Sequence, residues 1–463
     1  MSPMPNLTMT SAQHRQLLCH LFPGDGCEAA AILICARTPG PRVRLLVRDV
    51  LLVPHEDCKE RRSDYLQWPG LAIEEAIDRA GTKDLSLVLT HSHPGGLFDF
   101  SRQDDRSDQL TMPSIFQALG SLHGTAIMTP DGAMLARLYT PELATIPVNS
   151  VTVVGDDLTW WWADRRFSPR PVAFTGEATE ELARLSACVI GVSGTGSLVA
   201  EQLARLGFGQ VILIDFDKVE RRNLNRIINS TMEDATEQRP KVLAFAEAVA
   251  RYRGEGVAVP VTASILSREG VLSASQADVL FSCVDTLDGR QVADLICSSF
   301  LIPLIDIGVS IPTRRSGSGV AIAEVCGRID YVQPDGPSLQ DRGVYDPASL
   351  RAEYLRRTAA DAFREEVLAG YLRGINEEAP AVISLNMRAA SAAVLEFIAR
   401  AHPFRHEPNS ACVRTEFSLA SNEEEYISKA AFNAPASAPI ARGALEPLLG
   451  MPALQQSRPQ ANQ

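Results

Sequence analysis

The sequence predicts an α/β protein of two successive domains, the second built on a mainly parallel sheet. Two observations lead to this fold class. Residues 14 to about 145 alternate short apolar runs with helical stretches, and Gly and Pro mark the joins. From Cys188 onward the order becomes strand, glycine turn, helix, strand. That order is a β-α-β unit, in which the two strands are parallel neighbours of one sheet.

Length and composition indicate an ordinary globular chain. The 463 residues allow two or three domains of about 150 residues each, and 45% of them are hydrophobic and 22% charged. The net charge of -12 argues against a nucleic acid as the main partner. We expect a cytoplasmic protein with no signal peptide and no membrane span. Its nine cysteines form no C-x-x-C pair, which is typical of reduced thiols.

In the first domain, residues 1–145, apolar runs predict the strands and helical composition predicts one helix over Leu71–Ala80. The expected strands are Ala29–Cys35, Val43–Val47, Leu85–Thr90 and Thr125–Met128. Residues 146–176 look irregular, and we expect an inter-domain connector or docking segment there. Three successive tryptophans, Trp160 to Trp162, are more typical of a buried interface than of a ligand platform.

The second domain, residues 177–428, is expected to hold buried parallel strands, because their apolar character is continuous rather than alternating. The predicted elements are a strand ending at Val189–Ile190, a helix over Leu198–Leu206, and strands over Val211–Ile214, Val279–Cys283 and Pro303–Ile307. A packing helix is expected from apolar residues at helical spacing, namely Val382, Leu385, Ala389, Ala392, Leu395 and Ile398. Residues 429–463 are rich in Ala, Pro and Gln, which predicts a flexible tail.

The segment that begins at Thr90 carries the first chemical signal. His91 and His93 are two residues apart at the end of an extended run, so both imidazoles project from one face. Together with a carboxylate from the following turn, they suit a catalytic Zn²⁺ that keeps its fourth position for water. Glu28, just before an apolar strand, is a candidate general base. The alternative is a His-rich surface turn whose acidic residues are merely solvated.

These residues resemble the JAMM/MPN metalloprotease family, whose pattern is a Glu followed far downstream by H-x-H-P-x6-S-x2-D. The sequence matches every defined position, at Glu28, His91, His93, Pro94, Ser101 and Asp104. The resemblance covers roughly residues 14–140 and implies an α/β domain with a mixed sheet. It further implies that His91, His93 and Asp104 bind zinc and that Glu28 shuttles the proton. Ser101 would stabilise the oxyanion, and register favours Asp104 over its neighbour Asp105.

A glycine turn carries the second signal. Gly191, Gly194 and Gly196 lie between a strand and a helix, where backbone N–H groups can approach a phosphate at the helix N-terminus. Asp215 ends the next strand and suits ribose hydroxyls. By itself, this pattern fits any nucleotide-binding Rossmann domain, including that of a dehydrogenase.

Three further motifs follow: Asn223-Leu224-Asn225-Arg226, Arg239-Pro240-Lys241, and a strand-end Asp285. The ordered set resembles the ThiF/MoeB and ubiquitin-activating-enzyme adenylation family over roughly residues 165–400, including the stretch from Pro380 to Asn386. The resemblance implies a Rossmann-like homodimer in which Asp215 binds the ribose and Asp285 holds Mg²⁺. The ATP phosphates would be held by Asn223, Arg226 and Lys241. Cations there would neutralise charge that builds on the phosphate oxygens. The alternative is a surface Arg/Lys cluster beside a strand-end Asp without ligand.

The sequence departs from the family at three places. Arg170 is displaced by one position from the family's entry arginine, and Ser193 replaces the middle glycine of the turn. The family's C-x-x-C is absent, since the comparable stretch reads Gly336 to Asp341, and Cys326 lies in an apolar run typical of a packed thiol. Either the reaction stops at the acyl-adenylate, or Ser338 accepts the acyl group as an oxyester. A serine needs an activating base for that step.

The sequence therefore predicts a bifunctional enzyme of a bacterial ubiquitin-like conjugation system. It would adenylate the C-terminal carboxylate of a ubiquitin-like protein with Mg-ATP, and its zinc site would cleave peptide or isopeptide bonds to such C-termini. A separate conjugating enzyme is the expected next partner. One alternative is a sulfur-carrier adenylyltransferase with a carrier-processing peptidase. Another is a non-catalytic scaffold, which the intact acidic and histidine positions argue against.

Overall fold

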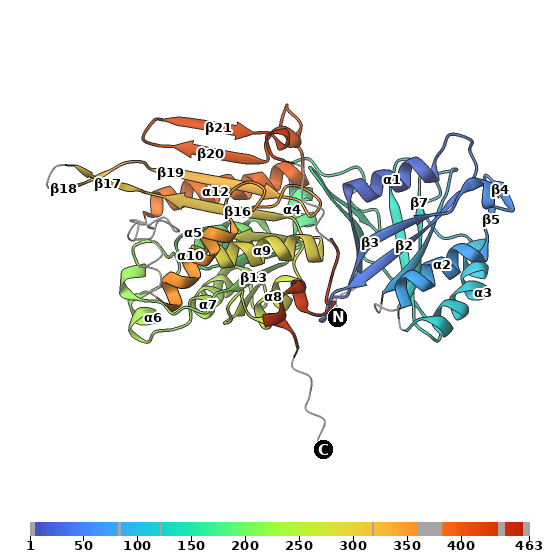
Figure 1. Cartoon of the computed structure of the whole chain (residues 1–463), viewed down its shortest axis with the longest axis horizontal. Helices are drawn as coiled ribbons and strands as arrows, with labels where there is room; N and C mark the ends of the chain where they lie inside the picture. The colour runs from blue at the N-terminus through green and yellow to red at the C-terminus, as the bar shows by residue number, and fades with distance from the viewer. Residues whose placement is uncertain are drawn as a thin grey trace, which may run out of the picture. The chain divides into compact units, whose positions relative to one another are not determined.

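Two separate sheets organise the chain, one in each of the two units into which it divides. The computed structural model describes residues 5–81, 85–120, 122–316, 319–359, 382–433 and 440–456. The first unit takes in the chain up to Pro169, Ser298–Leu301 and the segment from Pro439 onward, and the second unit holds the remainder. Figure 1 labels many of their helices and strands.

The first unit contains a mixed nine-stranded sheet in the order β11-β10-β1-β3-β2-β6-β7-β8-β9. Its main elements are β1 (Asn6–Thr10), α1 (Ser11–Leu21), β2 (Ala30–Arg37), β3 (Arg44–Leu52), β4 (Glu60–Arg62), β5 (Tyr65–Gln67), α2 (Gly70–Gly81), β6 (Ser86–Ser92), α3 (Arg102–Ala118), β7 (His123–Met128), β8 (Met134–Tyr139), β9 (Thr145–Pro147), β10 (Ser150–Val154) and β11 (Leu158–Trp162). The four strands and the helix expected before residue 145 are confirmed, each within a few residues. Parallel pairs (β1 with β3 and β10, β6 with β7) occur among antiparallel ones.

Packing on both faces of β2 explains why the sequence of this strand is apolar without alternation. Leu33 and Cys35 pack in one cluster with Leu17 and Leu21 of α1. Ile32 and Ile34, which point to the opposite face, pack in a second cluster with alanines of α2 and apolar residues of α3. Successive side chains of a strand point to opposite faces, so a strand covered on both faces is apolar throughout. Helices therefore cover both sides of this sheet.

The segment expected as an irregular connector, residues 146–176, is different in the structure. Residues 150–162 form β10 and β11, which pair with each other and extend the sheet beside β1. Trp160 and Trp162 are buried, and the half-buried Trp161 packs against the core of the same unit. The prediction was wrong because two short strands joined by the turn Gly155-Asp156-Asp157 resemble a loop in composition.

The second unit contains an eight-stranded sheet in the order β14-β13-β12-β15-β16-β19-β20-β21. Its main elements are α4 (Gly176–Leu182), β12 (Ser186–Ile190), α5 (Gly194–Leu206), β13 (Gln210–Ile214), α6 (Met232–Thr236), α7 (Lys241–Arg253), β14 (Ala258–Val261), α8 (Arg268–Ala274), β15 (Val279–Ser282), α9 (Leu287–Phe300), β16 (Leu304–Ser310), β17 (Thr313–Ser316), β18 (Gly319–Ile322), β19 (Cys326–Val332), α10 (Pro347–Thr358), α12 (Ile383–Ala401), β20 (Arg414–Ser418) and β21 (Glu423–Ile427). The strands from β14 to β16 are parallel, which confirms the Rossmann-like prediction. Strands β19 to β21 add an antiparallel edge (Figure 1) that the sequence did not predict.

The strand order creates one special position on this sheet. From β12 the chain moves outward through β13 to β14, and then crosses back to β15 on the other side of β12. The carboxyl ends of β12 and β15 therefore flank a point where the winding direction reverses. Ligands of open α/β sheets bind at such a switch point.

A buried charge network joins the parallel and antiparallel halves. Asp306 on β16 faces Asp330 on β19, and both are fully buried. Arg328 pairs with both carboxylates, and its Nη2 lies 2.7 Å from Asp306 Oδ2. Arg290 pairs with Asp306, and Asp330 also accepts from Arg342 and Arg414, at 3.1 and 2.8 Å. Removing one partner of such a buried group costs about 3–5 kcal/mol.

Helix α12 was predicted from its apolar spacing, and the helix is confirmed with two corrections. Leu385, Ala389 and Ile398 are buried, whereas Leu395 is 45% exposed and Val382, which precedes the helix as its N-cap, is 42% exposed. The buried face turns toward Ala390, Ala393 and Phe397 instead, because α12 packs against both α5 and β16. Among the described residues, no helix combines the length and apolar character that crossing a membrane requires.

The predicted flexible tail, residues 429–463, is partly packed. Ala441, Leu448, Leu449 and Leu454 are buried, and short 3-10 helices occur at Leu448–Gly450 and Pro452–Leu454. Residues 434–439 and 457–463 lie outside the described ranges. Composition misled here because small residues and prolines are also common in ordered irregular segments.

Buried Asp294 on α9 gives a test of this fold. Its carboxylate accepts from Leu339 N at 3.0 Å and Tyr345 Oη at 2.7 Å, and burial raises the pKa of Asp294 to about 6. The folded state then holds the proton more tightly than the unfolded state, so stability falls as pH rises from about 4 to about 6. Asp294→Asn should reduce the change in the free energy of unfolding over this pH range by roughly 2–3 kcal/mol. Urea unfolding of both proteins at pH 4.5 and 7.5 measures it, and an equal pH dependence in the two would contradict it.

Candidate functional site

The predicted metal ligands meet at the end of β6 and the start of α3. His91 Nε2 lies 3.1 Å from His93 Nε2 and 3.1 Å from Asp104 Oδ1. His93 Nε2 lies 3.5 Å from Asp104 Oδ2, and the three residues form a possible metal-ligand group. With ligand bonds of about 2.0–2.1 Å, the ligands of a tetrahedral zinc are about 3.3 Å apart. The three observed separations therefore fit a zinc ion.

Hydrogen bonds orient these ligands before any metal binds. His93 Nδ1 lies 2.7 Å from the carbonyl oxygen of Leu97, which places its proton on Nδ1 and leaves Nε2 free as a ligand. Such outer contacts commonly fix the tautomer of a ligating histidine. Burial alone would raise the pKa of Asp104, but its contacts with His91 and His93 hold it far below its ordinary value. The carboxylate is therefore ionised and ready to bind a cation.

Ser101 has a local role that the sequence analysis missed. Its Oγ accepts from the N–H groups of Gln103 and Asp104, both at 3.2 Å, and Ser101 N donates to Asp104 Oδ2 at 2.6 Å. This reciprocal pair is a capping box at the start of α3, and Ser-x-x-Asp was its visible signal. The cap fixes the Asp104 backbone, while the Ser101 hydroxyl proton remains available for an oxyanion.

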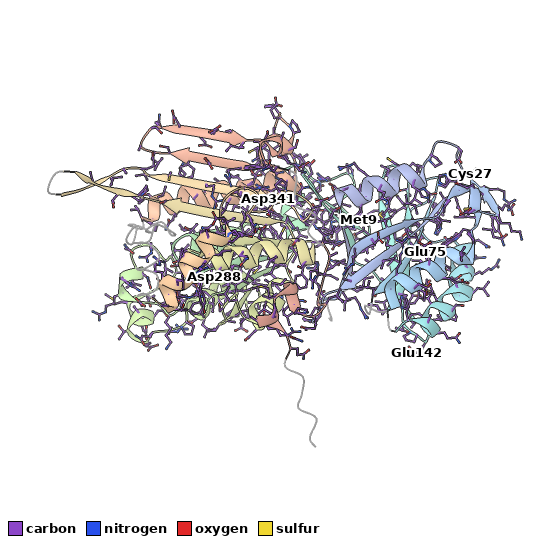
Figure 2. The ribbon with its side chains drawn as sticks, in the orientation of Figure 1. Met9, Cys27, Glu75, Glu142, Asp288 and Asp341 are labelled. Atoms are coloured by element: carbon purple, nitrogen blue, oxygen red, sulfur yellow. The ribbon has the colours of Figure 1, made fainter. Side chains whose placement is uncertain are left out.

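Glu28 is held through its backbone by a hairpin that the sequence analysis did not predict. Glu28 N donates to Arg62 O at 2.8 Å, and Arg61 Nε donates to Glu28 O at 2.9 Å. Both arginines lie on β4, and Figure 2 shows the preceding residue, Cys27, beside the β4–β5 hairpin. Burial raises the pKa of Glu28. A carboxylate with a raised pKa is a better proton acceptor near neutral pH.

Asp105, the alternative ligand considered from the sequence, faces a different partner. Its Oδ1 lies 2.6 Å from Arg137 Nη1, and Arg137 Nη2 lies 2.6 Å from Asp108 Oδ2. Tyr139 also donates to Asp108 at 2.7 Å. These bonds brace α3 against β8, so Asp105 is engaged with Arg137 while Asp104 faces the two histidines.

In the second unit, the predicted glycine turn lies at the switch point. Gly191 has a φ of +86°, and a Cβ there would lie 3.0 Å from the carbonyl oxygen of Cys283 after β15. A Cβ at Gly196 would lie 1.8 Å from the Gly191 oxygen, so only glycine fits. Gly194 begins α5 after Ser193, whose side chain makes no cap hydrogen bond. The turn thus leaves the N-terminus of α5 open to an anion.

Asp215 and Lys241 meet beside this turn. Asp215 Oδ2 accepts from Val192 N at 2.8 Å, and Lys241 Nζ lies 3.9 Å from the same oxygen. Lys241 also pairs with Asp217 at 2.8 Å, and both Asp215 and Lys241 are buried. Burial raises the pKa of Asp215, while the Lys241 charge opposes that rise. The turn is therefore joined directly to a carboxylate and a cation.

The Asn-Leu-Asn-Arg motif contributes one structural residue and one that faces the turn. Asn223 is buried, and its Oδ1 accepts from Glu220 N at 3.1 Å in a capping arrangement. Arg226 reaches Gly194, since a Cβ there would lie 3.1 Å from Arg226 Cδ. Its guanidinium donates to the carbonyl oxygen of Arg222 at 3.0 Å. Arg226 therefore lies against the glycine turn, and Asn223 stabilises the segment that carries Arg226.

Asp285 follows β15 and is exposed, and in the described part of the chain its carboxylate has no recorded hydrogen bond or ion pair. Arg290 donates to the neighbouring Val284 O at 3.0 Å and also pairs with buried Asp306. The loop that carries Asp285 is therefore fixed while its side chain remains open. Sequence reasoning missed Arg290 because no local pattern marks it.

Two residues considered for acyl transfer have other contacts. Ser338 Oγ donates to Asp341 Oδ2 at 2.7 Å and accepts from Asp341 N at 3.1 Å, so the hydroxyl closes a turn. Figure 2 labels Asp341 in this unit. Burial raises the pKa of the Cys326 thiol, which disfavours a reactive thiolate. Neither environment supports an acyl acceptor, and the oxyester hypothesis stays untested, as does the role of Arg170.

Comparisons with known proteins match both halves of the chain. Residues 169–441 match the ThiF family, and residues 10–139 match the prokaryotic homologs of the JAB domain. The chain is 26% identical over 164 residues to ubiquitin-like modifier-activating enzyme 5 of Aedes aegypti, and 28% over 163 residues to that of Caenorhabditis elegans. Each match covers 34% of this chain and 38% or 36% of the relative. The chain thus spans well under half the length of these relatives.

Solved structures of Escherichia coli MccB are also similar to the chain. One is titled as MccB with MccA-N7isoASN, with a TM-score of 0.44 and 15% identity, and covers 57% of this chain and 69% of that one. Another, MccB with ATP, has a TM-score of 0.42 at the same identity and coverage.

The metal site gives a prediction with a matched control in the next residue. Asp104→Asn should lose most of its zinc, because a neutral amide replaces the one anionic ligand. Asp105→Asn should retain about one zinc per chain, since Asp105 faces Arg137. Metal analysis after dialysis against excess zinc and then buffer measures both. Equal zinc contents in the two variants would contradict the assignment.

Proposed function

Because the chain belongs to the ThiF family and carries a Prok-JAB domain ahead of that match, we propose that it is a bifunctional enzyme of ubiquitin-like-protein chemistry. The second unit adenylates the C-terminal carboxylate of a ubiquitin-like protein. The first unit hydrolyses peptide or isopeptide bonds to such C-termini. The observation that carries the proposal is the meeting of the glycine turn, Asp215, Lys241 and Arg226 at the switch point, beside the open carboxylate of Asp285.

The geometry of the second unit supports adenylation. The carboxylate substrate attacks the α-phosphorus of ATP, an acyl-adenylate forms, and pyrophosphate leaves. Negative charge builds on phosphate oxygens during that step, and the open N-terminus of α5, Arg226 and Lys241 oppose it. Buried Asp215 suits the ribose hydroxyls. Asp285 would offer oxygen ligands to Mg²⁺, which when bound would neutralise negative charge on the phosphates.

The geometry of the first unit supports hydrolysis. His91, His93 and Asp104 would hold zinc, which when bound lowers the pKa of a water molecule towards neutrality. Glu28 would accept a proton from the attacking water and deliver it to the leaving amine. The Ser101 hydroxyl donates to the oxyanion of the tetrahedral intermediate. The backbone bonds from Arg61 and Arg62 keep Glu28 in place.

Several partners follow from this proposal. The ubiquitin-like protein is the shared substrate, because both sites act on its C-terminus. The described geometry around Ser338 and Cys326 favours release of the acyl-adenylate to a separate conjugating enzyme. We also propose a homodimer, zinc and magnesium as bound metals, and a cytoplasmic bacterial setting. These finer points rest on the family resemblance.

Pyrophosphate exchange tests the adenylation half. Wild-type protein with ATP, Mg²⁺ and a ubiquitin-like protein encoded beside it should exchange labelled pyrophosphate into ATP. Asp285→Asn should reduce the rate by at least about 100-fold, because magnesium loses its carboxylate ligand. Asp288→Asn is the matched control, since Asp288 lies in the first turn of α9, just after the Asp285 loop, and pairs with Arg357 at 2.8 Å. No exchange by wild type with any such protein would refute adenylation.

A cleavage assay tests the hydrolase half. Glu28→Gln should keep zinc, since Glu28 is not a ligand, and should cleave a fusion of the ubiquitin-like protein at least about 100-fold more slowly. Glu56→Gln, an exposed glutamate of the same unit, serves as the control. Gel analysis of cleavage and metal analysis give the two readouts. An active Glu28→Gln variant would remove Glu28 from the mechanism.

A further inference from the structure

A side chain from the far end of the second unit lies against the glycine turn. Asn386 belongs to α12, which packs along α5. A Cβ added to Gly194 would lie 2.5 Å from Asn386 Nδ2 and 3.1 Å from Arg226 Cδ. Asn386 and Arg226 therefore approach the same residue of the turn. The sequence motifs predict that Arg226 binds the nucleotide, and they assign no function to Asn386.

The side chain of Asn386 is almost fully buried, and its amide is unused. The residue is 3% exposed, and its backbone N–H makes an ordinary helical bond to Val382 O at 3.1 Å. Within the residues that the structure describes, its side-chain amide has no recorded hydrogen-bond partner. A ligand that accepted a hydrogen bond from Nδ2 would supply the partner that this amide lacks.

The surroundings of this amide favour an anionic ligand. Gly194 is the first residue of α5, a helix of 13 residues, and the N-cap Ser193 makes no side-chain cap bond. The first N–H groups of a helix have no intrahelical partner, and the helix dipole favours negative charge there. Arg226 adds a positive charge on the same side of the turn. The unpartnered amide and the helix end thus converge on one position.

We propose that Asn386 is a nucleotide-binding residue, whose Nδ2 donates to a phosphate oxygen of ATP at the N-terminus of α5. The inference rests on the proposed adenylation and extends its phosphate site from the glycine turn to α12. A phosphate suits the position better than the carboxylate of the protein substrate, because the open helix end and Arg226 both serve a phosphate group. Binding of ATP would then satisfy the buried amide that the free protein leaves without a partner.

Calorimetric titration of the full chain with ATP and, separately, adenosine tests the proposal. Asn386→Ala should weaken ATP binding roughly tenfold or more, the equivalent of one hydrogen bond to a charged group. Asn386→Asp should weaken it further, because a carboxylate repels phosphate although it has the shape of asparagine. Adenosine affinity should stay unchanged in both variants. Asn422→Asp, the same charge change at an exposed turn, should bind ATP as wild type does.

Other outcomes would overturn the assignment in distinguishable ways. If Asn386 served only packing, Asn386→Ala would be the weaker binder and the isosteric Asp variant would bind ATP normally. An equal loss for ATP and adenosine, together with a lower unfolding temperature without nucleotide, would also indicate packing. Normal ATP affinity with a raised KM for the ubiquitin-like protein would assign the amide to the substrate carboxylate instead. Failure of wild type to bind ATP would refute the adenylation proposal itself.

Discussion

The pairing of two buried aspartates with four arginines is the interaction on which the second unit depends. Asp306 and Asp330 lie opposite each other where the sheet changes from parallel to antiparallel. Burial alone would raise the pKa of Asp330, but three neighbouring arginines hold it below its ordinary value. Asp330 is therefore held as a charged partner inside the protein. Removing a single member would leave an uncompensated charge, which makes the junction sensitive to any one substitution.

The same network reaches the loop that carries Asp285. Arg290 joins Asp306 to the Val284 carbonyl, one residue before Asp285. A rigid core is thus connected to a loop whose carboxylate stays exposed. The switch point adds a second constraint, because α12 presses Asn386 against the first residue of α5. The phosphate end of the site is consequently built from elements almost 200 residues apart in sequence.

In the first unit, contacts between nearby residues position the candidate site residues. Asp104 is set by a capping box with Ser101, and the helix that carries both is braced by the bonds of Arg137 to Asp105 and Asp108. Glu28 is held by backbone bonds to β4. These contacts fix the segments that carry Asp104 and Glu28, while Asp104 Oδ1 still faces His91. Such preorganisation is what a catalytic metal site requires.

The sequence by itself determined the fold class, most strands and the chemical groups, because apolar runs, glycine turns and motif spacing are local properties. His91, His93 and Asp104 could be grouped in this way, as could Gly191 with Asp215. Only the tertiary structure decided what long-range packing controls. In the structure, residues 150–162 form two strands, and α12 is oriented so that Leu395 is exposed. The Ser338 hydroxyl closes a turn by its hydrogen bond to Asp341. Contacts between distant segments leave no periodic trace in a sequence, so Asn386 and Arg290 became visible only in the fold.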